Sequence, residues 1–198
     1  MTAHPDNASL RKTVRTVGAL NLGYFGIEFA VALAIGSVAL FADSVDFLED
    51  ASVNFLIFFG LGWSAVRRAR LGMILAGILL IPGLATFWTA WVNFSEAHVP
   101  APVPLTLAGL GALAVNFTCA TMLVRFRDHA GSLTRAAFLS ARNDVLANIA
   151  IILTGGLTAA TASHWPDLVT GLGIAAMNAD AAHEVFEAAR TEHAAAKP

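Results

Sequence analysis

The segment VALFADSVDFLEDASVNFLIFF, residues 38–59, combines an apolar run long enough to cross a membrane with four acidic residues inside it. A carboxylate near the centre of a bilayer costs roughly 2.5–3.5 kcal/mol on insertion scales, so an acid at that depth is expected to have a function. At about 100° per residue, Asp43, Asp46 and Asp50 fall within roughly 60° of one another on a helix, and Glu49 lies just outside that arc. One face of the predicted helix therefore carries a column of carboxylates, which suits a cation or protons and not lipid.

The composition of the whole chain indicates an integral membrane protein. Of its 198 residues, 57% are hydrophobic and 13% are charged, and the mean hydropathy is +0.66, outside the range of ordinary soluble proteins. Six apolar stretches approach the ~20 residues needed to cross a bilayer about 30 Å thick: 15–36, 38–61, 71–92, 103–124, 136–157 and 165–187. We predict an all-α membrane protein with six transmembrane helices in one domain, residues 1–198.

The basic residues indicate how these helices are oriented. Eleven of the 12 Lys and Arg residues lie at one side of the predicted membrane: Arg11, Lys12, Arg15, Arg67, Arg68, Arg70, Arg125, Arg127, Arg135, Arg190 and Lys197. By the positive-inside rule this side is cytoplasmic, so both termini are predicted to lie inside a cell membrane. The twelfth, Arg142, lies within the fifth span, where it either snorkels to the interface or pairs with Glu49.

A second polar stripe lies on the fifth predicted span. Ser140, Asp144 and Asn148 recur every four residues, within roughly 80° on a helix, and Asn143 borders them. Asp46 and Asp144 each lie about nine residues from the start of their span, so at 1.5 Å per residue both lie near the midplane. The second and fifth spans run in opposite directions through the membrane. Two acidic stripes at one depth on antiparallel helices predict a shared cation site.

These motifs resemble those of the cation diffusion facilitator family. Its members have six spans with both ends inside, and they carry a ligand, three residues and then Asp on the second and fifth spans. The spacing is matched here by Asp46 and Asp50 on the second span and by Ser140 and Asp144 on the fifth. The similarity extends to the sixth span, with PDL at 166–168 and GLGI at 171–174. The family usually adds a cytoplasmic ferredoxin-like domain, which we expect this short chain to lack.

The resemblance implies a secondary transporter that exports a divalent metal cation from the cytoplasm. Asp46, Asp50 and Asp144 would bind the ion, and Ser140 or Asn148 would complete a near-tetrahedral shell. Carboxylates at the midplane can bind metal and protons in turn, which would couple outward metal movement to inward protons. We therefore take Asp46, Asp50, Ser140 and Asp144 as candidate metal ligands. Candidates for a second shell or a proton path are Glu28, Asp43, Glu49, Asn143 and Asn148.

Zinc is the expected substrate, with cadmium beside it, because zinc accepts oxygen ligands. Many zinc-transporting relatives have His where this chain has Ser140, so a nitrogen ligand is missing. Manganese and iron(II) are therefore alternatives, since they are disfavoured least by an all-oxygen shell. The metal is a substrate; no cofactor and no nucleic-acid partner are expected. The single cysteine, Cys119, excludes an intramolecular disulfide or a cysteine metal cluster within this chain.

A membrane enzyme is the rival from another class. Paired aspartates can hold Mg²⁺ for transfer of a phospho-alcohol group, and Asp43-Ser-Val-Asp46 superficially resembles that arrangement. However, that chemistry requires glycine and arginine soon after the second Asp, whereas Phe47, Leu48 and Glu49 follow here. We therefore expect a transporter and not an enzyme. A channel or a purely structural role remains a further alternative.

The resemblance also implies a homodimer. Without the cytoplasmic domain, the contact must come from membrane helices, where small residues let two backbones approach closely. The third span carries no charged residue and contains four small ones suited to this role: Gly72, Ala76, Gly77 and Gly83. We therefore predict that this span forms the dimer contact.

Overall fold

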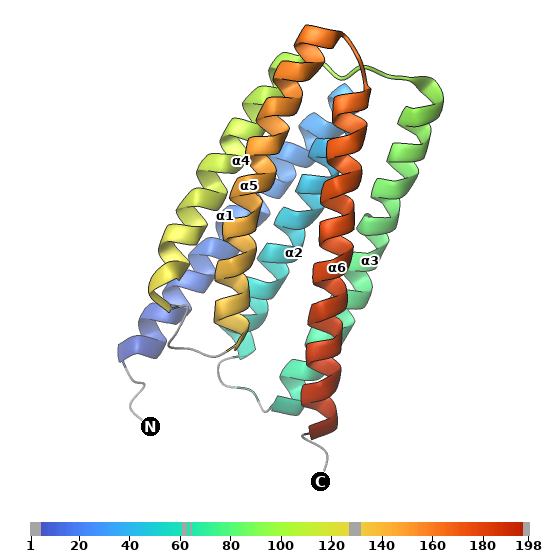
Figure 1. Cartoon of the computed structure of the whole chain (residues 1–198). Coiled ribbons are helices and arrows are strands. Elements are labelled where there is room, and N and C mark those ends of the chain that lie inside the picture. The colour runs from blue at the N-terminus through green and yellow to red at the C-terminus, as the bar shows by residue number, and fades with distance from the viewer. Residues whose placement is uncertain (1–4, 61–62, 64, 127–131, 196–198) are drawn as a thin grey trace.

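The computed structural model describes the chain except residues 1–4, 61–62, 64, 127–131 and 196–198, and in parts of some helices it describes the backbone alone (Figure 1). The described residues form six long helices and one short 3-10 helix: α1 (Pro5–Ile35), α2 (Val38–Gly60), α3 (Ala65–Glu96), α4 (Pro102–Leu123), η1 (Val124–Phe126), α5 (Ser132–Thr161) and α6 (Trp165–Ala195). None of the described residues lies in a strand. The prediction of an all-α bundle of six helices is confirmed.

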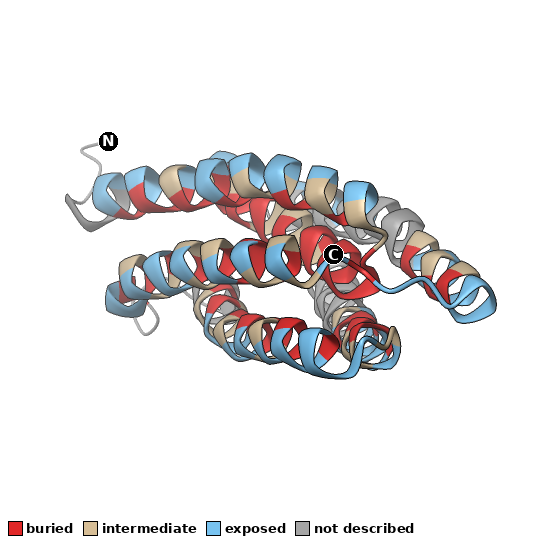
Figure 2. Cartoon of the chain, turned by 90° about the horizontal axis from the view of Figure 1, so that it is seen from above, coloured by how far each residue is buried: buried red, intermediate tan, exposed pale blue. Residues whose placement is uncertain are grey.

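The described part of the chain contains three segments long and apolar enough to cross a membrane: Ala8–Ile35, Pro102–Phe126 and Ala137–Thr161. The acid-bearing helix α2 differs from them, because its 23 residues include four acids. It lies inside the bundle instead, in contact with each of the other five long helices. Figure 2 shows buried residues on the faces that the helices turn toward one another and exposed residues on the outside. The other helices therefore cover the polar face of α2.

The helices continue past the predicted spans at the end of the bundle where the basic residues lie. There α1, α3 and α5 begin, and α6 ends, several residues beyond the apolar stretches. Arg11 and Arg67 thus lie on helical turns and not in loops, since a helix satisfies its own backbone whether or not lipid surrounds it. Arg127 and Lys197 lie outside the described residues. The start of α1 and the end of α6 lie at the same end of the bundle (Figure 1).

At the opposite end, a carboxylate of α6 holds the first turn of α2. Asp167 is fully buried and accepts hydrogen bonds from the Ser37 hydroxyl at 2.5 Å and from the backbone N–H groups of Val38 at 2.7 Å and Ala39 at 3.3 Å. Ser37 caps the same helix, since its hydroxyl oxygen accepts from the N–H of Leu40 at 3.1 Å. A negative charge here satisfies free N–H groups and matches the helix dipole. Asp167 therefore fixes where α2 begins.

The two helices meet closely enough that only glycine fits at the contact. A Cβ atom added to Gly171 would lie 2.7 Å from the backbone carbonyl carbon of Val38, closer than real Cβ contacts. Gly171 thus brings the backbone of α6 against the start of α2, as small residues do between membrane helices.

The short turn before α2 is also held from the other side. Gly36 has a φ of +65°, a conformation that favours glycine, and its carbonyl oxygen accepts from the Asn93 side chain at 3.2 Å. His98 Nε2 lies 2.9 Å from the carbonyl oxygen of Ile35. The end of α3 and the loop after it therefore hold the turn between α1 and α2 in place.

Replacing Asp167 with Ala should destabilise the bundle, because the N–H groups of Val38 and Ala39 would stay buried without an acceptor. A buried donor left without an acceptor costs about 1–3 kcal/mol, so we expect a loss of at least about 2 kcal/mol in the free energy of unfolding. Thermal unfolding in mild detergent, followed by circular dichroism, measures it. The matched control is Asp180→Ala, which changes an exposed acid on the same helix. Equal Tm values for the two variants would contradict the proposed role of Asp167.

Candidate cation site

Asp50 is buried where α1, α2 and α5 meet, and both of its carboxylate oxygens accept hydrogen bonds. The Ser140 hydroxyl on α5 donates to Oδ1 at 3.0 Å, and the Asn21 amide on α1 donates to Oδ2 at 3.5 Å. Asn54, one turn further along α2, donates to the backbone carbonyl of Asp50 at 2.8 Å. Two neighbouring helices thus hold this carboxylate in place.

The acidic stripes of α2 and α5 meet in the interior. The carboxyl groups of Asp46 and Asp144 lie within hydrogen-bonding reach of each other, and Asp144 also lies within reach of Asp50. Asp144 is 7% exposed and Asp50 5% exposed. The structure therefore brings together the three acids that sequence spacing placed at one depth, on antiparallel helices and away from the outer surface.

These acids do not form a preformed coordination site for a metal ion. Among the described residues, no group of three or more His, Cys, Asp or Glu side chains is arranged to hold a metal. Both oxygens of Asp50 are occupied by hydrogen bonds from Ser140 and Asn21. Binding of a cation would therefore require Asp50 to exchange at least one of these donors for the ion and the carboxylates to converge.

Ser140 and Asn148, the two candidates for a fourth ligand, occupy different positions. Ser140 is half-buried and its hydroxyl touches Asp50, so it lies at the acids. Asn148 is fully buried with both amide atoms engaged: Nδ2 donates to Asp43 Oδ2 at 2.8 Å, and Oδ1 accepts from Asn116 Nδ2 at 3.1 Å. As placed, Ser140 is next to the candidate ligands, and Asn148 holds Asp43.

Glu28 and Asp43 lie together in the interface between α1 and α2. Both are fully buried, and their carboxyl groups are within hydrogen-bonding reach of each other. Of the other residues proposed for a second shell or proton path, Glu49 is half-buried on α2 and lies near Asp46 and Asp50.

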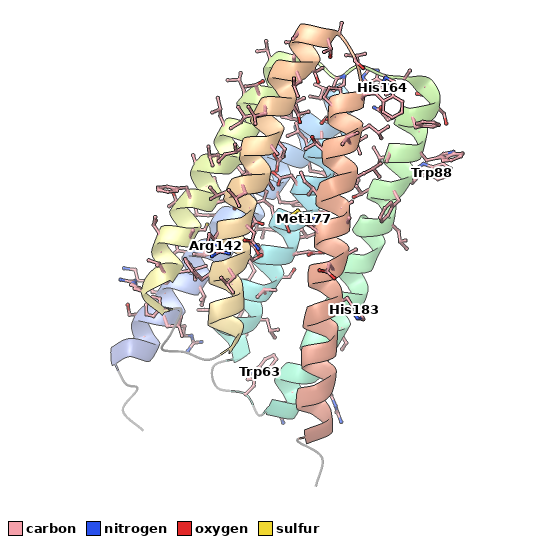
Figure 3. All side chains as sticks on the ribbon, viewed as in Figure 1. Trp63, Trp88, Arg142, His164, Met177 and His183 are labelled. Atoms are coloured by element: carbon pink, nitrogen blue, oxygen red, sulfur yellow. The ribbon has the colours of Figure 1, made fainter. Side chains whose placement is uncertain are left out.

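Asn143 does not join this group. It is exposed on α5, and its side-chain oxygen accepts from Arg142 at 3.3 Å. Arg142 is exposed as well (Figure 3), and the described residues show no ion pair between it and Glu49. Of the two interpretations of Arg142, the one in which its head reaches the surface agrees with its position.

Three buried amides around the acids were missed by sequence reasoning. Asn21, Asn54 and Asn116 are each no more than 2% exposed. A signal for Asn21 was present, because it lies seven residues before Glu28 and therefore on the same face of α1. Asn116 had a weaker one, as an amide in an otherwise apolar helix. Membrane helices place such groups inward, since lipid offers them no hydrogen bond.

A family model of the cation efflux transmembrane domain matches residues 14–191. The chain belongs to the cation efflux family. The match spans the positions of Asn21, Glu28, the acids of α2 and the polar stripe of α5. No curated protein matches the chain.

Membership of the cation efflux family confirms the resemblance inferred from the sequence motifs and establishes a membrane transporter of cations. Members of the cation efflux family are transporters and not enzymes, which supports the transporter over the Mg²⁺-dependent transferase. The acids of α2 and α5 are the residues of this cation efflux protein whose chemistry suits a cation.

Proposed function

We propose that this cation efflux protein exports divalent metal cations from the cytoplasm, zinc first, in exchange for protons. The observation that carries the proposal is the meeting of Asp46, Asp50 and Asp144 inside the bundle. Asp50 and Asp144 are buried and Asp46 is half-buried, and three ionised carboxylates this close together repel one another and need compensating positive charge. No Lys or Arg faces them among the described residues, so a dication or protons are the fitting partners.

The ion would bind by exchange of hydrogen bonds for coordination. Asp46, Asp50 and Asp144 supply the carboxylate oxygens, and Ser140 turns its hydroxyl oxygen to the ion when Asp50 no longer accepts its proton. Asn21, which donates to Asp50 over 3.5 Å, is the weaker of its two donors and the easier to release. Protons and metal compete for the same oxygens, which is sufficient to couple their movements.

The proposed orientation places the end of the bundle where α1 begins in the cytoplasm. Arg11, Lys12 and Arg15 are exposed on the first turns of α1, and Arg67 and Arg70 are exposed near the start of α3. These helix starts lie at the same end (Figure 1). A cluster of exposed basic side chains at one end is what the positive-inside rule expects on the cytoplasmic face of a cell membrane.

The identity of the metal depends on Ser140. With a hydroxyl at this position the groups that meet at the acids are all oxygen donors, which zinc and cadmium accept and which also suit manganese and iron(II). This observation favours manganese or iron(II) export as the second candidate function.

We further propose that two copies associate through α3. Its described residues Leu84, Trp88 and Trp91 are between 66% and 69% exposed, so this helix lies at the periphery of the chain (Figure 3). The small residues expected at the contact occupy 72–83, where the backbone is helical and the side chains lie outside the described part.

The first prediction concerns the acids. Asp50→Ala and Asp144→Ala should each lower zinc affinity and proteoliposome transport by more than about 100-fold, because even indirect changes around metal ligands cost 10–100-fold. Calorimetric titration in detergent and a zinc-sensitive dye with an imposed pH gradient measure the two effects. Glu96→Ala, an exposed acid on α3, is the control. Zinc binding that survived both substitutions would place the ion elsewhere.

A second prediction concerns selectivity. Ser140→His should add a nitrogen ligand and raise the zinc-to-manganese uptake ratio at least about tenfold, because imidazole suits zinc whereas carboxylate and water suit manganese. Competition uptake measures this ratio, and Ser140→Ala is the matched control that removes the hydroxyl without adding a ligand. An unchanged ratio in Ser140→His would mean that position 140 does not touch the ion.

A third prediction concerns the dimer. Single cysteines introduced along 72–83 in a Cys119→Ser background should cross-link between copies at every third or fourth position, as one face of a helix requires. Cysteines at the same spacing on α4 serve as the control. No cross-link at any of these α3 positions, together with only monomer in native mass spectrometry, would show that one chain is the transport unit.

A further inference from the structure

Glu28 is a buried acid that is not one of the proposed cation ligands Asp46, Asp50 and Asp144. It is fully buried on α1, and neither of its carboxylate oxygens has a hydrogen-bond partner among the described residues. The same is true of Oδ1 of Asp43, which lies opposite on α2. Two neighbouring carboxyl groups thus hold three buried oxygens that have no hydrogen-bond donor among the described residues.

The other oxygen of Asp43 is already committed. It accepts from Asn148 at 2.8 Å, and Asn148 in turn accepts from Asn116 at 3.1 Å. Because the carbonyl oxygen of Asn148 is used by Asn116, its amide must donate to Asp43. This chain of amides across α4, α5 and α2 satisfies Oδ2 of Asp43 and leaves Oδ1 without a hydrogen-bond partner among the described residues.

Among the side chains that the structure describes, none supplies the missing donor. On α1, the Tyr24 hydroxyl donates to the backbone carbonyl of Ala108 at 2.6 Å. On α6, the Asn178 amide donates to the carbonyl of Ala42 at 3.3 Å. On α2, the nearest further titratable group is Asp46, another acid, and α4 carries only Cys119, whose Sγ contacts Asn21. No described Lys, Arg or His faces Glu28.

Two ionised carboxylates cannot remain in contact under these conditions. Each buried charge without a partner costs several kcal/mol, and like charges at this range oppose each other. One proton between them removes both costs, because it converts the repelling pair into a short charge-assisted hydrogen bond. The chemistry of the pair therefore calls for a single proton.

We propose that Glu28 and Asp43 form a proton-binding pair, separate from the cation ligands, which carries the proton exchanged for metal. The proposal rests on the proposed function as a proton-coupled exporter. The proton binds to a carboxylate oxygen of the pair from the outer side and later leaves toward the cytoplasm, and no other bond changes.

The position of the pair on α2 suits this role. Asp43 lies three residues before Asp46, about one helical turn nearer the end of α2 that Asp167 caps. A proton from the proposed outer side would thus meet the pair before it meets the ligands. A dication bound at Asp46, one turn away, would favour the ionised pair and expel the proton, which is a direct electrostatic coupling.

Glu28→Gln tests the pair, because glutamine keeps the shape and can donate to Asp43 without binding a transferable proton. Infrared difference spectra at neutral pH should show a protonated carboxylic acid in the wild type that Glu28→Gln lacks and the exposed control Glu96→Gln keeps. Asp43→Asn should also lack it, and this variant replaces Glu28→Gln if the latter fails to fold. A spectrum unchanged in both variants would show that Glu28 and Asp43 do not bind a shared proton.

The coupling is tested on the same variants. Calorimetric titration of zinc in buffers of different ionisation enthalpy should give about one proton fewer released per bound ion in Glu28→Gln than in the wild type. A pH gradient should accelerate zinc flux in proteoliposomes less in Glu28→Gln than in the wild type, because only the proton exchange at the cation ligands remains. Wild-type proton release and acceleration in Glu28→Gln would overturn the carrier role. A wild-type protein that transports no zinc would contradict the proposed function. The infrared spectra would still show whether Glu28 and Asp43 share a proton.

Discussion

The presence of four acids on one helix, two of them buried and two half-buried, is the constraint on which the rest of the structure depends. Lipid offers a carboxylate neither water nor a hydrogen-bond donor, so each acid of α2 must be satisfied by another helix. Helix α1 supplies Asn21, and α5 supplies Ser140 and Asn148. The result is a bundle in which α2 touches every other long helix. The apolar core clusters fill the layers between these polar contacts.

The polar interior separates into two layers with different environments. In one, Asp50 accepts from groups that can be released one at a time, a hydroxyl at 3.0 Å and an amide at 3.5 Å. In the other, Asp43 is bound by a short amide contact at 2.8 Å and faces a carboxyl group. Labile donors suit a group that must exchange partners, whereas a fixed donor suits a group that must keep its orientation. The division assigns different tasks to two acids of α2 that lie about two helical turns apart.

Much of the bundle could be predicted from the sequence because its signals are periodic. Hydrophobicity located all six helices, and the 3.6-residue repeat placed Asp46 opposite Asp144. Helix ends could not be predicted, since hydrogen bonding continues through polar turns where hydrophobicity stops. Asn148 belongs to the predicted polar stripe and Asn143 borders it, yet only Asn148 is buried, because the residues at the edge of a stripe face the interior or not according to how α5 packs against α4. Asn21 was missed because its one signal, a position seven residues before Glu28 on the same helix face, links only two polar residues in an apolar helix.

The turn of two residues between α1 and α2 has a consequence for how the chain enters a membrane. Each of the four acids in α2 raises the free energy of insertion by roughly 2.5–3.5 kcal/mol, whereas each Leu, Ile, Phe or Val lowers it by only about 0.3–0.6 kcal/mol. On its own, such a segment is a poor substrate for the translocon. With Gly36 and Ser37 as the only residues between them, α1 and α2 can leave the ribosome as one hairpin, in which Asn21 already reaches Asp50 and Glu28 already faces Asp43. Insertion of α1 and α2 as a hairpin would give Asp50 a hydrogen-bond donor from Asn21 while the pair enters the lipid, which would lower the cost of inserting α2.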